Sequence, residues 1–150
     1  MGRIPESNPR HRTKQQLITD ITFVLNSNLH FGTKTAVLTD ATWVWSEYEG
    51  KYKGCGFWSE AAARCGDTKL LRHDHAVPRK LLLDWLLNLR SPTQDSIQAL
   101  LDAYCKAAVI IKSEDALLNR LGLRSKMPSD WDGKDPWARY KAAGIVLCRK

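Results

Sequence analysis

The sequence predicts an α+β fold that is predominantly helical, with two or three short strands. Most apolar residues recur at helical spacing, and only a few short runs rich in β-branched residues have the character of strands. Of the 150 residues, 43% are hydrophobic and 26% are charged, a composition that is ordinary for one globular domain. We therefore expect a single domain over residues 13–150, preceded by a flexible basic arm over residues 1–12.

The first half of the chain carries signals for three helices. Thr13 is a suitable N-cap for a helix over residues 13–29, whose apolar side chains fall on one face. The apolar stretch over residues 36–45 has an ambiguous periodicity, and we favour a helix there. After a glycine-rich turn, residues 57–63 predict a short helix.

The second half alternates between strand and helix signals. In chain order, the pattern predicts a strand at 69–72, helices at 78–89 and from 93, a strand at 107–111, helices from 113 and at 137–143, and a strand at 145–148. The apolar run at 107–111 is the strongest strand signal. Ser113 follows it as an expected N-cap, with two acidic residues that suit the positive end of the helix dipole.

Charge and targeting signals narrow the classes of function. The 23 Lys and Arg residues outnumber 16 Asp and Glu residues, which leaves a net charge of +7, concentrated in residues 51–80 and 119–150. Such a surface favours a polyphosphate partner, although solubility alone also accounts for it. No apolar run approaches the roughly 20 residues of a membrane span, and no secretory signal begins the chain. Four irregularly spaced cysteines predict reduced thiols, so we expect a cytoplasmic protein without a membrane partner.

The tripeptide His73-Asp74-His75 is the most informative candidate site. Imidazole nitrogen and carboxylate oxygen are both good ligands for a divalent metal ion. On an extended segment the two histidines project to one side and Asp74 to the other, so one ion reaches all three only if the chain turns. Two further interpretations stay open: surface histidines beside a helix N-terminus, and a structural zinc site that includes Cys55 and Cys65.

The segment His73-Asp74-His75-Ala76-Val77-Pro78 resembles the first motif of the HNH, or ββα-metal, nucleases. The strand expected at 107–111 and the helix expected after it are similar in layout to the remainder of that motif. The resemblance covers roughly residues 69–121 and implies an irregular ββα-metal-like core. It also implies a divalent metal cofactor (Mg, Mn or Zn) and nucleic acid, in particular DNA, as the partner.

The resemblance implies a role for each candidate residue. His75 is the base that activates water, and Asp74 is a metal ligand. The helix expected after the second strand supplies further ligands or orienting groups, Asp115 and Asn119, which are four apart and share a face. Glu114 of the same helix and His73 of the motif are additional candidates. Contacts to nucleic acid are expected from the basic residues beside the motif: Arg72, Arg79 and Lys80.

Two functions are compatible with these residues. The first is a metal-dependent endonuclease that hydrolyses DNA phosphodiesters, favoured by the Asp74-His75 pair beside a strand. The alternative is a non-catalytic basic protein, with a regulatory or inhibitory role, that binds nucleic acid or another protein. The absence of any histidine after His75 favours this alternative.

Two tryptophans lie in the polar segment near the C-terminus. Trp131 and Trp137 are interleaved with Arg139 and Lys141, an arrangement that suits stacking on unpaired bases. They suit equally a role as anchors that cover the core under a long loop, and we favour the anchor interpretation.

Overall fold

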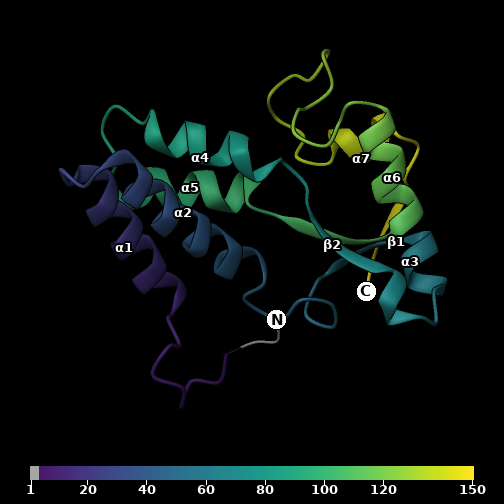
Figure 1. Ribbon diagram of the computed structural model, residues 1–150, viewed down its shortest axis with the longest axis horizontal. Helices are drawn as coiled ribbons and strands as arrows, with labels where there is room; N and C mark the ends of the chain where they lie inside the picture. The colour runs from purple at the N-terminus through teal and green to yellow at the C-terminus, as the bar shows by residue number, and fades with distance from the viewer. Residues whose placement is uncertain (1–3) are drawn as a thin grey trace.

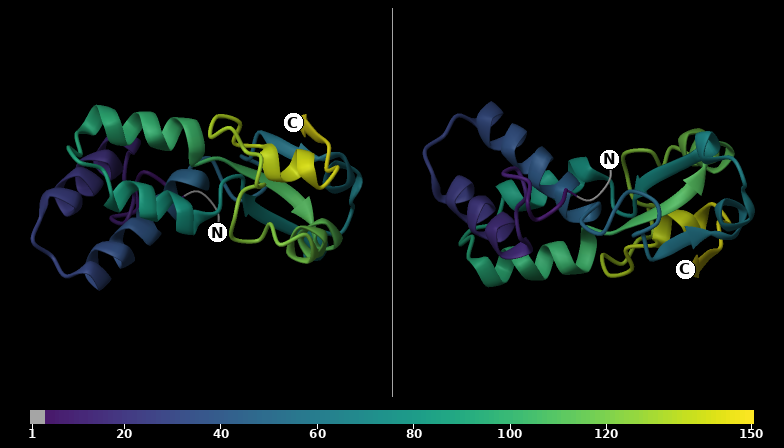
Figure 2. Two further views of the ribbon diagram at one scale, coloured as in Figure 1. Left: turned by 90° about the horizontal axis from the view of Figure 1, so that it is seen from above. Right: turned by 90° about the horizontal axis from the view of Figure 1, so that it is seen from below.

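The computed structural model describes residues 4–150 and has an α+β fold, as the sequence predicts. Two lobes lie side by side along the long axis of the molecule (Figures 1 and 2). The helical lobe contains α1 (Lys14–Asn26), α2 (Phe31–Ser46), α4 (Arg79–Leu87) and α5 (Gln94–Tyr104). The sheet lobe contains β1 (Phe57–Ser59), β2 (Leu71–His75), β3 (Ala107–Ile111) and β4 (Leu147–Arg149), with α3 (Glu60–Arg64), η1 (Thr68–Leu70), α6 (Lys112–Arg120) and α7 (Ala138–Ala142).

The helical lobe is held by aliphatic side chains at helical spacing. Leu17, Ile21, Leu82 and Leu101 have no exposed surface, and each contributes about 1.5–3 kcal/mol through burial. Thr13 caps α1 as predicted: its hydroxyl accepts from the Gln16 amide at 3.1 Å, and the Gln16 side chain accepts from the Thr13 amide at 2.8 Å. Among residues 4–150, no helix has the length and apolar character needed to cross a bilayer.

The sheet has the strand order β2-β3-β1-β4. β3 lies next to β2 in antiparallel pairing and next to β1 in parallel pairing, while β4 pairs antiparallel with β1. Both faces of β3 are covered. On one face its side chains join those of α6 and α7 in a cluster of buried residues: Ala76, Ala108, Ile110, Leu118, Tyr140 and Ile145. On the other face the buried cluster comprises Cys55, Trp58, Ala62, Leu71 and Val109.

Two strands near the motif differ from the sequence prediction, while other elements, such as α2 and β4, differ in their bounds. Residues 57–59 form a strand instead of the start of a helix, because they pair with β3 on one side and β4 on the other. Helix α3 begins only at Glu60, after Ser59 accepts a hydrogen bond from the Ala62 amide at 3.0 Å. The second difference is β2, which runs over residues 71–75 and not 69–72, so His73-Asp74-His75 lies within the strand.

Helix α6 follows β3 without a loop. Ser113 is not its N-cap as predicted; the Glu114 carboxylate instead accepts a hydrogen bond from the Ile111 amide at 3.0 Å. The same carboxylate oxygen accepts from the Ser59 hydroxyl at 2.6 Å, which ties α6 to β1. Helix α6 packs against both β2 and β3. The elements β2, β3 and α6 thus form an antiparallel pair covered by the helix that follows it, and α4 and α5 are inserted in the chain between the two strands.

The N-terminal segment approaches the helical lobe. His11 Nδ1 lies 2.9 Å from the Ile4 carbonyl oxygen, and Arg12 forms an ion pair with Asp40 of α2 at 2.7 Å. Residues 1–3 of the arm predicted over residues 1–12 lie outside the described residues.

Candidate functional site

The alternation of side chains along β2 divides the His73-Asp74-His75 motif between two environments. β2 pairs with β3 residue by residue, from Leu71 opposite Ile111 to His75 opposite Ala107. Successive side chains of such a strand point to opposite faces. The structure therefore separates Asp74 from both histidines, and the chain makes no turn within the motif that would bring all three to one ion.

Asp74 faces α7, where two side chains bind its carboxylate. Arg139 Nη2 donates to Asp74 Oδ2 at 2.6 Å, and the Tyr140 hydroxyl donates to the same oxygen at 2.7 Å. The remaining Arg139 donors reach backbone carbonyls: Nε donates to Ala76 at 3.0 Å, and Nη1 donates to Leu123 at 2.6 Å. Nη2 also donates to the His75 carbonyl. We call this set the Asp74–Arg139 network.

Burial dominates the electrostatics of this network. Arg139 is 2% exposed, whereas the Asp74 side chain retains 23% of its surface. Burial raises the pKa of Asp74, and the charge of Arg139 and the two hydrogen bonds act in the opposite direction. Burial, followed by the nearby Asp74 charge, raises the pKa of Tyr140 well above its usual value, so the hydroxyl stays protonated and donates.

The helix that follows β3 places the other predicted carboxylates. The charge of Asp115 adds a small contribution to the raised pKa of Asp74, of which burial is the main cause. Asn119, one turn later, is exposed. Glu114 is engaged by the Ser59 hydroxyl and the Ile111 amide. The structure thus leaves His75 on the opposite side of β2 from Asp74.

The two histidines face the C-terminal end of α2. The Trp43 ring stacks on His75, with ring centroids 5.3 Å apart and an interplanar angle of 26°. Ser46 Oγ lies 3.2 Å from His75 Nε2, and Glu47 Oε1 lies 3.8 Å from His73 Nδ1. Within residues 4–150, neither ring nitrogen of His73 has a hydrogen-bond partner. We call these five residues the histidine cluster.

Both histidines are neutral at physiological pH. Burial lowers the pKa of His73 to about 4, and burial together with nearby positive charge lowers the pKa of His75 to about 3. The His73 side chain has no exposed surface, and His75 is 7% exposed. This geometry argues against His75 as a water-activating base, because its Nδ1 is buried and its Nε2 lies against the Ser46 hydroxyl.

The residues present do not fit a shared metal ion. Across the part of the chain that the structure describes, no three His, Cys, Asp or Glu side chains form a group able to hold one. On the Asp74 side, the Arg139 guanidinium already compensates the carboxylate. The zinc alternative also lacks support: Cys55 donates to the Phe57 and Ala107 carbonyls at 3.4 Å, and burial raises the pKa of its thiol.

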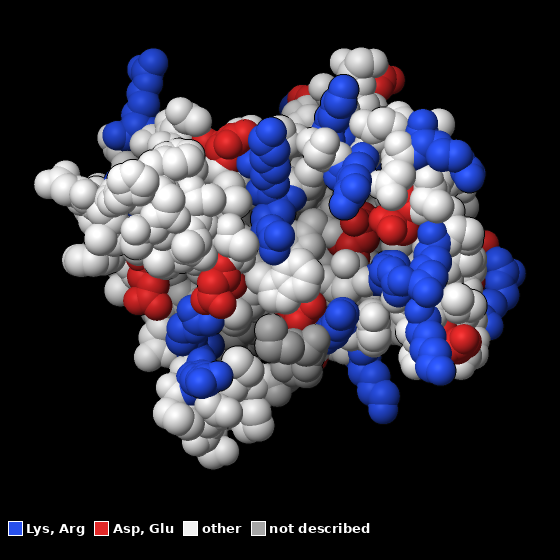
Figure 3. All heavy atoms as spheres, viewed as in Figure 1, with Lys and Arg blue, Asp and Glu red and all other residues white. Residues whose placement is uncertain are grey.

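The predicted basic residues lie at different depths around the motif. Arg72 donates from Nη1 to the Leu71 carbonyl at 2.7 Å. The Arg79 guanidinium lies 5.0 Å from the centre of the Trp43 ring, and Lys80 is exposed at the start of α4. Figure 3 shows that Lys and Arg side chains gather over the sheet lobe on this face, around a smaller group of acidic side chains.

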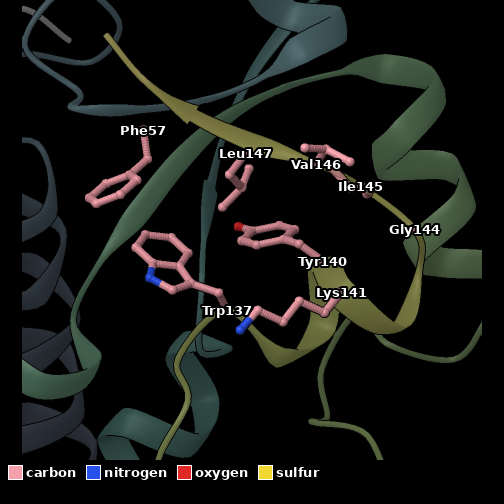
Figure 4. Close-up of a pocket in the computed structure, with 8 residues that line it drawn as sticks. All are labelled: Phe57, Trp137, Tyr140, Lys141, Gly144, Ile145, Val146 and Leu147. Atoms are coloured by element: carbon pink, nitrogen blue, oxygen red, sulfur yellow. The ribbon is translucent and has the colours of Figure 1, made fainter.

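A cavity of about 510 Å³ opens between α7 and the segment leading into β4 (Figure 4). Its walls are formed by Phe57, Trp137, Tyr140, Lys141 and residues 144–147. The rings of Phe57 and Trp137 touch at one end, with centroids 4.6 Å apart. Most of this lining is apolar, and a volume of this size is typical of small-molecule sites.

Trp131 is an anchor, as favoured from the sequence. Its ring stacks on Trp85 of α4, with centroids 5.8 Å apart and an interplanar angle of 16°, and its Nε1 donates to the Asp135 carbonyl at 2.7 Å. The loop before α7 is thereby fastened to the helical lobe. Trp137 also packs on a buried cluster, that of the sheet lobe, as the anchor interpretation expects, and it lines the cavity as well.

Sequence reasoning missed the partners of the motif. Arg139 and Tyr140 are 65 and 66 residues away from Asp74, and no local spacing connects them. Trp43 lies in the apolar stretch predicted as a helix, and neither it nor Glu47 carried a signal that connects it to the motif.

Comparisons with known proteins identify no family. No family model matches the chain, and the comparisons with curated proteins and with solved structures give no match. A functional interpretation therefore depends on the geometry and the charge of the chain itself.

The Asp74–Arg139 network should stabilise the sheet lobe strongly. We expect Asp74→Ala to lower the free energy of unfolding by about 3 kcal/mol, because it leaves a buried guanidinium without its counter-charge. In a double-mutant cycle with Arg139→Met, measured by urea unfolding, the coupling should exceed about 1 kcal/mol. The matched control is the exposed Lys141–Asp135 pair (2.7 Å) of the same region, whose coupling should stay below about 1 kcal/mol. Equal coupling in both pairs would contradict this role.

Acid should destabilise the protein through the histidine cluster. In the unfolded chain His73 binds a proton near pH 6.5, whereas in the fold it does so only near pH 4, so stability is full above pH 6.5 and declines as the pH falls. His73 accounts for about 3 kcal/mol between pH 7 and 4. We expect the free energy of unfolding of His73→Gln to depend less on pH between 7 and 4 than that of the wild type. The raised pKa of Asp74 has the opposite effect on stability, and it contributes equally to both proteins.

The control for the pH profile is His30→Asn, which replaces an exposed histidine and keeps an N-capping side chain on α2. Its profile should follow that of the wild type. A wild-type profile that is level between pH 7 and 4, or an unaltered slope in His73→Gln, would show that the buried imidazoles do not control acid stability.

Proposed function

We propose that this protein binds nucleic acid, in particular DNA, through the basic face of its sheet lobe, without catalysing a reaction. The observation that carries the proposal is the gathering of Lys and Arg side chains over this lobe (Figure 3). The elements of the lobe and the turns beside them carry exposed basic residues: Arg64, Lys69, Lys112, Arg120, Arg124 and Lys126. Positive charge at this density attracts a phosphate backbone through counterion release.

Several of these charges are available for binding. Among residues 4–150, the ion pairs of basic side chains involve Arg12, Arg64, Arg139 and Lys141, with His73 as a neutral neighbour of Glu47. Lys112 and Arg120, at the two ends of α6, therefore have no acidic partner within the described chain. Phosphate contacts of this kind position a protein on nucleic acid without specifying a sequence.

The polar groups of the motif on β2 support binding over hydrolysis. Asp74 is compensated by Arg139 and Tyr140, and His75 is buried on the opposite side of β2. A hydrolytic site needs a base and a charge-stabilising group on the same side of the scissile bond. The proposal places the protein in the cytoplasm, in keeping with its four free cysteines.

The proposal predicts a steep salt dependence of DNA binding. We expect the affinity for a duplex oligonucleotide, measured by fluorescence anisotropy, to fall with rising salt, and the double variant Lys112→Gln, Arg120→Gln to reduce the log–log slope by about two. The matched control is Arg90→Gln, which removes one exposed positive charge from the helical lobe and should leave the slope unchanged. Absent or salt-independent binding would disprove the proposal.

Metal-dependent phosphodiester hydrolysis of HNH-like type is the second candidate, and one observation favours it. The order β2-β3-α6, with α6 packed on both strands, is the order of elements in a ββα nuclease core. The fit of the residues is poor, as the Asp74–Arg139 network and the burial of His75 indicate, so it ranks below simple binding.

A plasmid assay separates the two candidates. We expect supercoiled DNA to stay intact when the purified wild-type protein is added with Mg²⁺, Mn²⁺ or Zn²⁺. Nicking by the wild type that disappears in His75→Ala, but persists in His30→Asn, would establish hydrolysis instead and would require β2 or α2 to rearrange.

A further inference from the structure

We propose that the cavity between α7 and β4 holds one unpaired base of single-stranded nucleic acid. This inference rests on the nucleic-acid binding proposed above and specifies a form of the polymer that the basic face alone does not select. The cavity belongs to the same lobe as that face and lies beside the Asp74–Arg139 network (Figures 1 and 4).

Aromatic rings supply the surface on which a base would stack. Trp137 and Tyr140 line the cavity with their centroids 6.0 Å apart and an interplanar angle of 31°, and Phe57 adjoins Trp137. The Tyr140 side chain has no exposed surface and its hydroxyl donates to Asp74, so it supports Trp137 from behind, and the partly buried Trp137 and Phe57 rings are the ones that a base can reach. Figure 4 shows Leu147 opposite these rings, on the β4 side. Aromatic faces accept any base, because each base has a π-face.

Cations beside the apolar lining favour a base attached to phosphates over an uncharged apolar ligand. Lys141 lines the cavity, and its ion pair with Asp135 is largely exposed, so exchange of that carboxylate for a phosphate costs little. The Arg149 guanidinium lies 5.5 Å from the centre of the Phe57 ring, which itself lines the cavity. A nucleotide, whose base is an aromatic ring and whose phosphate is anionic, complements this combination of aromatic and basic side chains.

The cavity wall is fixed before any ligand binds. Arg139 and Tyr140 hold α7 to β2, and Gly144 ends the helix with a φ of +70°, a left-handed conformation that favours glycine. The chain then enters β4, which pairs with β1. A preformed site loses little conformational entropy on binding, so stacking contributes almost fully to affinity.

The test compares strands that differ only in their bases. We would measure the Kd of the full-length protein for an oligothymidine and for an abasic strand of equal length, at one salt concentration. Because both strands carry nearly the same number of phosphates, the ratio of the two Kd values isolates the contribution of the bases. We expect the abasic strand to bind about tenfold more weakly to the wild type.

A blocking variant assigns the effect to the cavity. Val146 lines the cavity and is 58% exposed, so Val146→Trp closes the opening without removing a core side chain. We expect the abasic-to-thymidine ratio to fall to about one in this variant. The matched control is Leu121→Trp, at another exposed apolar position of the sheet lobe (49% exposed), which should keep the wild-type ratio. Near-ultraviolet circular dichroism checks that both variants keep their fold.

The possible failures are distinguishable. Wild-type binding with a ratio of one, or a tenfold ratio that persists in Val146→Trp, overturns the base-binding cavity while leaving the basic face intact. Tighter binding of duplex than of oligothymidine also overturns it. If neither strand nor duplex binds at low salt, both this inference and the proposed function are wrong.

Discussion

One buried guanidinium holds the sheet lobe in its conformation. Arg139 donates to the Asp74 carboxylate and to the carbonyls of His75, Ala76 and Leu123, so the end of β2, the segment after α6 and α7 all converge on it. An arginine that is 2% exposed stays charged, and its desolvation is tolerable only when each donor finds an acceptor. The position of α7, and with it the shape of the adjacent cavity, depends on this side chain.

The same network determines what the motif on β2 can do. Pairing with β3 directs Asp74 towards Arg139 and directs both histidines towards α2, where they are neutral and enclosed by Trp43. The charged groups of the motif therefore stabilise the packing of β2 on α7. The proposed binding of nucleic acid therefore involves exposed residues at the periphery of the lobe, and not this motif.

Local signals predicted most of the elements but little of the site. Strand β3 was predicted with its observed bounds, because a central strand that is buried on both faces has a continuous apolar sequence. Residues 57–59 were assigned to a helix because their strand pairing involves partners about 50 and 90 residues away. The motif was found from its residue types, and alternation on an extended strand correctly separated Asp74 from the histidines. Its partners were not found, since Arg139 meets Asp74 only through tertiary packing.

The path of the chain between the lobes has a mechanical consequence. The chain builds α1 and α2, enters the sheet lobe for β1, α3 and β2, returns for α4 and α5, and crosses back at β3. Two of these crossings are short: Cys105 and Lys106 join α5 to β3, and the buried Ala76, Val77 and Pro78 join β2 to α4. A single linker permits hinge bending, whereas several short connections in parallel act as a brace. Neither lobe is a contiguous segment, so neither can be excised as an autonomous folding unit. The short connections restrict changes in the relative orientation of the two lobes, also when one of them binds a ligand.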